Sequence, residues 1–136
     1  FSAVERYLDQ VKVRKMGLIG SLHTMTEATY AEVYECAGMT VVRPEEPHLN
    51  QVAEIVFREL IRGMFRTESQ KIVRDCFNHL GARGVDAIVL GCTELGLLVP
   101  QREWLVQLGD GERRIPVVDL IEVHVDQAIR WMLAAP

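Results

Sequence analysis

Apolar residues along the chain follow two different spacings, and these spacings predict its secondary structure. Five stretches carry apolar residues every three or four positions, the spacing of one helix face: 2–13, 27–37, 49–63, 68–80 and 120–133. Four shorter runs are continuously apolar or rich in β-branched residues and predict strands: 15–20, 39–43, 85–90 and 115–118. Because strands alternate with helices, we expect an α/β fold with a parallel four-stranded sheet and helices on both faces.

Polar and glycine-rich segments mark where these elements end. We expect residues 21–26 to form a polar loop, with the Thr26 hydroxyl capping the helix that follows. Gly38 ends that helix, because glycine readily adopts the left-handed conformation found after a helix. Residues 109–114 (GDGERR) are expected to form a second polar loop rather than a linker between domains.

One predicted helix is apolar around more of its circumference than a surface helix requires. Its main stripe consists of Leu49, Val52, Ala53, Val56 and Leu60. This stripe is widened by four further residues: Ile55, Phe57, Ile61 and Met64. We therefore expect a second contact surface on this helix, facing a partner domain or a second subunit.

Composition narrows the class of protein. At 136 residues and 15.4 kDa, the chain is long enough for one ordinary domain with a buried core. The net charge of −4 argues against nucleic acid or an anionic membrane as a partner, since either would favour a basic surface. No apolar run approaches the ~18 residues that span a bilayer. Three cysteines without a Cys-x-x-Cys pair favour a reducing compartment, and we expect a cytoplasmic protein.

Candidate chemistry lies where two predicted strands end. Ligands of open parallel sheets bind beyond the carboxyl ends of the strands, and segments 20–26 and 90–95 follow two of them. In the second segment, Cys92 follows Gly91 and precedes a predicted helical turn that begins at Thr93. The free N–H groups of that turn are expected to lower the pKa of the Cys92 thiol. A thiolate beside amides that hold a carboxylate is suited to removing a proton from the carbon next to that carboxylate.

Structural interpretations of the same residues stay open when only the residue pattern is considered. Free cysteine is among the most buried residue types, so Cys92 is also compatible with a packing role. Cys36 and Cys76 lie within helical patterns and are expected to belong to the core. His79 follows Cys76 on one helix, but two ligands are too few for a zinc site, and we expect no metal. His23 is interpreted as a polar loop residue.

Residues 88–95 (IVLGCTEL) and 17–21 (GLIGS) each combine a buried strand with a chemically rich loop. The first string resembles the second cysteine motif of the aspartate/glutamate racemase family. The second string, followed by Thr24, Met25 and Tyr30, resembles the strand and loop that open the second domain of that family.

Two further segments extend this resemblance toward the C-terminus. Residues 59–63 (ELIRG) are similar to a helix end of that domain, and residues 116–119 (PVVD), followed by His124, are similar to its last strand and closing helix. The resemblance implies that residues 1–119 form the second, flavodoxin-like half of a two-domain racemase fold. Residues 120–136 would then be a closing helix that packs on a first domain missing from this chain.

In the family that these motifs resemble, the active site lies in a cleft between two similar domains, and each domain contributes one cysteine. One thiolate removes the α-proton, and the other cysteine delivers a proton to the opposite face, without pyridoxal phosphate or a metal. The resemblance therefore implies no cofactor and assigns catalysis to Cys92. It assigns substrate binding to four residues: Ser21, Thr24, Thr93 and Glu94.

The identity of residue 94 bears on the substrate. The glutamate-specific branch of the family usually has histidine where this chain has Glu94, so the resemblance favours action on aspartate or on both acidic amino acids. The expected partners are a small dicarboxylic amino acid, the missing first domain and, in a homodimer, a second copy. The alternatives are a related cysteine-dependent decarboxylase or hydantoin racemase, or a non-catalytic domain that binds small acids. A Cys-Asn-Thr type motif about a hundred residues upstream of Cys92 would favour the racemase.

Overall fold

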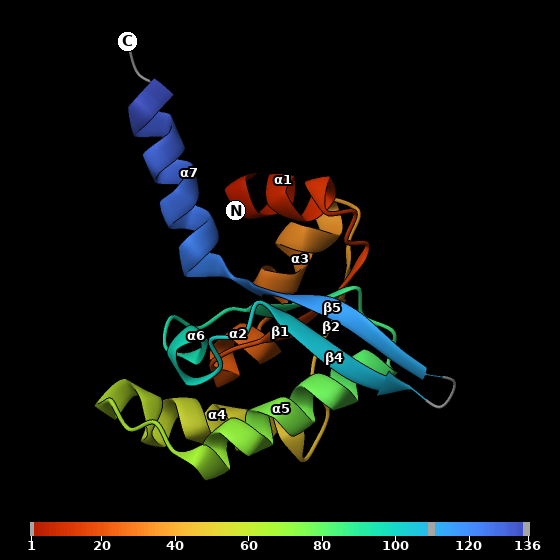
Figure 1. Cartoon of the computed structure of the whole chain (residues 1–136), viewed down its shortest axis with the longest axis vertical. Helices are drawn as coiled ribbons and strands as arrows, with labels where there is room; N and C mark the ends of the chain where they lie inside the picture. Colours follow the sequence, from red (N-terminus) through yellow and green to blue (C-terminus); the bar gives the residue numbers. More distant parts are fainter. Residues whose placement is uncertain (1, 109–110, 135–136) are drawn as a thin grey trace.

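A computed structural model describes residues 2–108 and 111–134, in which helices alternate with strands (Figure 1). Its helices are α1 (Ser2–Gln10), α2 (Leu22–Thr26), α3 (Ala28–Cys36), α4 (His48–Arg58), the 3₁₀ turn η1 (Leu60–Arg62), α5 (Thr67–Ala82), α6 (Leu95–Leu98) and α7 (Leu120–Ala134). Its strands are β1 (Lys15–Ile19), β2 (Thr40–Val42), β3 (Ala87–Leu90), β4 (Glu103–Leu108) and β5 (Gly111–Asp119). The expectation of an α/β fold is confirmed.

The strands form one sheet in the order β2-β1-β3-β5-β4. Neighbouring strands from β2 to β5 are parallel, as predicted, whereas β4 runs antiparallel to β5 at the edge. The sheet therefore has five strands, and the prediction of four parallel strands is wrong at this edge. Antiparallel edge strands are common on otherwise parallel sheets, so the fold class is unaffected.

Part of the hairpin of β4 and β5 lies where the sequence predicts a loop. Gly111–Arg114, expected to be part of a polar loop, is the first part of β5. Its polar side chains pair across the hairpin, as when Arg114 donates a hydrogen bond to Glu103 at 3.0 Å. Such pairs stabilise a strand without producing an alternation of apolar residues. Residues 109–110 of the expected loop lie outside the described residues.

Helices cover both faces of the sheet, as predicted (Figure 1). Ile88 and Leu90 of β3 belong to a core shared with α4 and α5. Ala87 and Val89 point the other way, into a core shared with α1 and α3. All four residues are buried, so β3 lies at the centre of the molecule and the loop after it starts from the buried core.

The segment between β1 and α3 contains the short helix α2 and is not a loop. The Ser21 hydroxyl oxygen accepts a hydrogen bond from the Thr24 backbone N–H at 3.2 Å and so caps the start of α2. Thr26 does not cap α3, because its hydroxyl donates to the Leu22 carbonyl within α2 at 2.8 Å. The prediction that Thr26 caps α3 is therefore wrong: Ser21 caps α2, and Glu27, at the start of α3, makes no side-chain cap hydrogen bond.

The wide apolar face of α4 and η1 is only partly uncovered. Ile55 is 5% exposed and belongs to the core of this chain, so its assignment to a second contact surface is wrong. Phe57 and Ile61 are 67% and 55% exposed, and they leave an uncovered apolar surface on this side. Met64 is half-buried.

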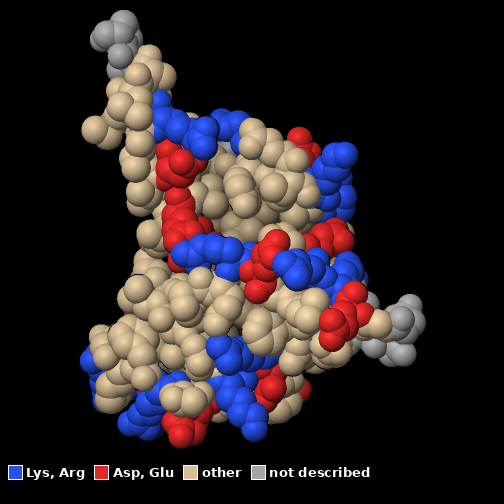
Figure 2. All heavy atoms as spheres, in the orientation of Figure 1, with Lys and Arg blue, Asp and Glu red and all other residues tan. Residues whose placement is uncertain are grey.

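The last helix, α7, follows β5 directly, contacts α1 and then extends away from the rest of the molecule (Figure 1). None of its described residues is buried. Six of its large apolar side chains are exposed: Ile121, Val125, Ile129, Trp131, Met132 and Leu133. Beside this helix, acidic and basic side chains lie interspersed across the middle of the molecule (Figure 2). No helix in the described part of the chain is long and apolar enough to cross a membrane.

Gly81→Ala should destabilise the fold by overpacking the contact between α5 and β4. A Cβ at Gly81 would lie 2.5 Å from the Cγ1 atom of Val106 and closer still to its other methyl carbon. We expect the free energy of unfolding, measured by urea denaturation, to fall by about 1–3 kcal/mol. Val106→Ala removes both methyl groups, so the same glycine substitution should cost much less in that background. An equal cost in both backgrounds would contradict the packing described.

Candidate active site at the carboxyl ends of β1 and β3

The two segments with candidate chemistry meet at one edge of the sheet. β1 and β3 are neighbouring parallel strands, and Ile19 pairs with Leu90 at their carboxyl ends. Gly91, the next residue along, donates its backbone N–H to the Ile19 carbonyl at 2.7 Å. The loop that leads into α2 and the loop that carries Cys92 therefore start side by side, at the sheet edge where the sequence predicts a ligand site.

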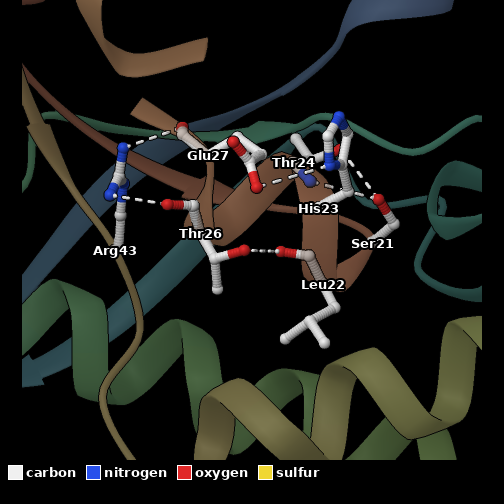
Figure 3. Close-up of polar contacts among 7 residues, drawn as sticks. All are labelled: Ser21, Leu22, His23, Thr24, Thr26, Glu27 and Arg43. Carbon is white, nitrogen blue, oxygen red and sulfur yellow. Dashed lines mark hydrogen bonds and ion pairs between the residues drawn. The ribbon is translucent and has the colours of Figure 1, made fainter. Parts of the chain in front are cut away.

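Thr24 joins these two loops through its methyl group. Thr24 is 6% exposed, and a Cβ at Gly91 would lie 2.7 Å from its Cγ2 atom. A Cβ at Gly20 would lie 3.0 Å from the same atom. Glycine at both positions therefore lets the methyl group pack directly on the backbone of both loops. The Ser21 hydroxyl, 3.0 Å from the Thr24 hydroxyl, holds the side chain in this position (Figure 3).

Arg43 supports the far end of α2. Its guanidinium donates to the Glu27 carbonyl at 3.0 Å and lies 3.4 Å from the Thr26 carbonyl, where α2 meets α3 (Figure 3). Carbonyl groups at the end of a helix lack partners within the helix, so this contact satisfies them. No motif marks Arg43 in the sequence, because the contact joins residues 16 and 17 positions apart.

His23 lies on the exposed side of α2 and not in a loop. Its ring approaches Glu27 to 3.8 Å and meets the ring of Tyr30 edge-on, with ring centroids 5.6 Å apart. Next to these residues, a cavity of about 180 Å³ opens beside the strand ends, with Thr24, Gly91 and His124 among the residues that line it. The cavity gives a small molecule room close to the loop that carries Cys92.

Cys92 is half-buried, and its thiol is oriented by a neighbouring carboxylate. The Cys92 thiol donates a hydrogen bond to the Oε2 atom of Glu94 at 3.1 Å. The Thr93 hydroxyl donates to the same oxygen at 2.5 Å. Both hydrogen bonds lower the pKa of Glu94, so its carboxylate is ionised at neutral pH. The structure thus brings together three of the predicted site residues in one hydrogen-bonded group, next to the loop of Ser21 and Thr24.

The pKa of the Cys92 thiol is shifted in the direction opposite to the one expected. Burial raises it to about 11, and the hydrogen bond to Glu94 and the negative charge of that residue add to the rise. Backbone N–H groups of Glu94 and Leu95 act in the expected direction and lower the pKa, but burial outweighs them. Since α6 contains only four residues, its dipole is small. Cys92 is therefore a thiol in this chain at neutral pH, and the prediction of a lowered pKa is wrong.

The other cysteines stand apart from this site. Cys76 is fully buried in α5, as expected for a core residue, and burial raises the pKa of its thiol to about 12. Cys36 is exposed at the end of α3, so the prediction that it belongs to the core is wrong. Within residues 2–108 and 111–134, no group of three or more His, Cys, Asp and Glu side chains is arranged to hold a metal ion.

Comparison with known proteins finds similarity along most of the chain. Residues 2–128 match the sequence model of the family described as Asp/Glu/hydantoin racemase. A glutamate racemase from Corynebacterium glutamicum is 30% identical over 112 residues, which are 81% of this chain and 37% of that protein. The chain therefore spans little more than a third of this curated relative.

Two solved structures share the fold. The crystal structure of a candidate Asp/Glu racemase from Yersinia pestis has a TM-score of 0.80 and 29% identity, over 97% of this chain and 54% of that one. An aspartate racemase homologue from Pyrococcus horikoshii has a TM-score of 0.74 and 30% identity, over 96% of this chain and 53% of that one. In both cases the similarity covers about half of the solved chain.

Glu94→Gln should lower the pKa of the Cys92 thiol. Glutamine keeps a hydrogen-bond acceptor but removes the negative charge that disfavours the thiolate. We expect the pH dependence of Cys92 alkylation by iodoacetamide to shift to lower pH than in the wild type. The experiment uses a Cys36→Ser background, which removes the exposed thiol, and reads the labelled cysteine by mass spectrometry. Glu27→Gln, at an exposed carboxylate between α2 and α3, is the matched control. Identical midpoints for Glu94→Gln and the wild type would contradict this assignment.

Proposed function

The chain belongs to the Asp/Glu/hydantoin racemase family, and we propose that it forms the second, Cys92-bearing half of a two-domain amino-acid racemase. The observation that carries this proposal is the Cys92 thiol beyond the end of the central strand β3, oriented by a hydrogen bond to Glu94 at 3.1 Å. The solved relatives, of which the chain covers 54% and 53%, support a first domain of similar size.

The proposed chemistry is the exchange of a proton between the two faces of the substrate α-carbon. In one direction, a base of the first domain removes the α-proton, and the Cys92 thiol gives its own proton to the opposite face and becomes a thiolate. In the other direction, the Cys92 thiolate removes the α-proton and the first domain supplies the new one. Each group must come within about 2.6–3.2 Å of its proton partner, so Cys92 serves one face only. Because the pKa of its thiol is about 11 in this chain, Cys92 is protonated at neutral pH and is ready to act as the acid. Neither pyridoxal phosphate nor a metal takes part in this scheme.

The proposed substrate is aspartate, or both aspartate and glutamate. The ionised Glu94 carboxylate suits the ammonium group of an amino acid, because opposite charges attract strongly in a partly buried site. The Ser21 hydroxyl can donate a hydrogen bond to a substrate carboxylate, and the Thr93 hydroxyl can do so once it releases Glu94. Buried Thr24 acts by holding Ser21 beside the Cys92 loop. In this proposal the four residues bind and orient the substrate while Cys92 moves the proton.

The uncovered apolar surfaces suit the partners that this proposal requires. The exposed face of α7 would pack on the first domain, so that residues 120–136 close the two-domain unit. Phe57 and Ile61, exposed on the opposite side of the sheet from α1, would contact the first domain or a second copy in a homodimer. We also propose a cytoplasmic location, because three free cysteines fit a reducing compartment.

Racemisation by the full-length protein should depend on Cys92. With L-aspartate or L-glutamate, we expect the D-isomer to appear, as measured by chiral chromatography. Cys92→Ser should abolish it, because one face of the α-carbon loses its acid–base group. Cys36→Ser, the same change at an exposed cysteine away from the site, should keep the activity. The 136-residue chain alone should leave both amino acids unchanged, since it supplies one half of the site.

Several outcomes would contradict this proposal and point to another function. Formation of the D-isomer by the 136-residue chain alone would mean that both acid–base groups lie within it. Turnover of a 5-substituted hydantoin but of neither amino acid would indicate a hydantoin racemase. Release of carbon dioxide from a substituted malonate would indicate a decarboxylase, and binding of small acids without turnover would indicate a non-catalytic domain.

A further inference from the structure

Asp119, the last residue of β5, is a buried acidic residue outside the proposed catalytic group. It is 8% exposed and pairs in the sheet with Leu90, the last residue of β3. Cys92 follows Leu90 by two positions. The loop that carries the thiol therefore leaves the sheet directly beside Asp119.

The Asp119 carboxylate also contacts the other end of this loop. A Cβ at Gly96, in α6, would overlap the Asp119 Oδ2 atom and lie 3.0 Å from its Cγ atom. The carboxylate thus fits against the backbone of α6 at a position where only glycine leaves room. The other oxygen, Oδ1, accepts a hydrogen bond from the Ile121 backbone N–H at 2.9 Å, in the first turn of α7. One side chain therefore contacts both α6 and α7.

We propose that Asp119 is a positioning residue for Cys92, which fixes the loop of residues 91–94 between the end of β3 and Gly96. This inference rests on the proposed function for the catalytic meaning of Cys92. Because the same carboxylate caps α7, the position of the closing helix and the position of the thiol are linked through one side chain. Docking of another domain on the exposed face of α7 would then change the position of the thiol.

A role in capping α7 alone would have different consequences. A cap requires one oxygen atom at residue 119, and its loss affects the stability of the helix without changing Cys92. Positioning of the loop also requires the oxygen that packs against Gly96. Asp119→Ser separates the two roles, since serine keeps a hydroxyl that can cap α7 but lacks the atom that reaches α6.

The first arm of the test measures alkylation of Cys92 by iodoacetamide in the 136-residue chain with Cys36→Ser. Asp119→Ser should speed alkylation several-fold, because a loosened loop admits water to the thiol and relieves the burial that raises its pKa. Asp126→Asn is the matched control, since this exposed residue of α7 pairs with Arg130 at 2.6 Å. Its alkylation rate should equal that of the parent chain. Unchanged alkylation in Asp119→Ser, with only a lower melting temperature, would overturn the proposal.

A second variant tests the same contact from the other side. Gly96→Ala should push the carboxylate away and also speed alkylation of Cys92. Adding Asp119→Ala removes the overlapping atoms, so the melting temperature should recover relative to Gly96→Ala alone, while alkylation stays faster than in the parent chain. A normal alkylation rate in a folded Gly96→Ala chain would contradict the proposal.

The second arm measures kcat and KM in the full-length protein. Asp119→Ser should lower kcat by up to about 100-fold, the scale of loss when a reacting group is displaced by about an ångström. The change in KM should be smaller than the change in kcat. If the wild-type protein does not racemise amino acids, the proposed function fails, while the alkylation arm still decides whether Asp119 positions Cys92. Wild-type kcat in Asp119→Ser would overturn the positioning role.

Discussion

The contact between the Thr24 methyl group and the backbone of Gly91 sets the geometry on which the rest of the site depends. A Cβ at Gly91 would come within 2.7 Å of the Thr24 methyl carbon, so this methyl group packs on the backbone where the loops after β1 and β3 leave the sheet. This approach places the Ser21 hydroxyl and the Cys92 thiol at the same edge of the sheet. Parallel pairing of β1 with β3 makes the contact possible, and the helices on both faces keep those strands buried.

The electrostatic environment of Cys92 favours a bound proton. Backbone N–H groups of Glu94 and Leu95 lower the thiol pKa as a helix start would, but burial and the nearby carboxylate outweigh them. A residue that rests as a thiol is a ready proton donor to a carbanion. A reversible racemase needs one protonated and one deprotonated group across the substrate, and in the proposed mechanism Cys92 supplies the protonated one.

Much of the fold follows from the sequence pattern, because its central strands and main helices are apolar with clear periods. The loop that carries Cys92 and Glu94 was also predictable, since glycine after a buried strand marks a strand end where ligands bind. The antiparallel hairpin of β4 and β5 was not predicted, because the first residues of β5, Gly111–Arg114, are polar and resemble a loop. Tertiary packing decides that Ile55 is buried and Cys36 exposed, although both lie in similar helical patterns. The thiol pKa could not be predicted, because burial, its largest cause, depends on the whole fold.

In the proposed mechanism, Cys92 acts on one face of the α-carbon while a group outside this chain acts on the other. The most direct measurement is the deuterium content of both isomers at low conversion, when the full-length protein acts on L-aspartate in D₂O, read by proton NMR and mass spectrometry. Two separate acid–base groups predict deuterium at the α-carbon of the D-aspartate formed and protium in the remaining L-aspartate. Deuterium in both isomers from the start would mean that a single group serves both faces, and would contradict the two-group mechanism.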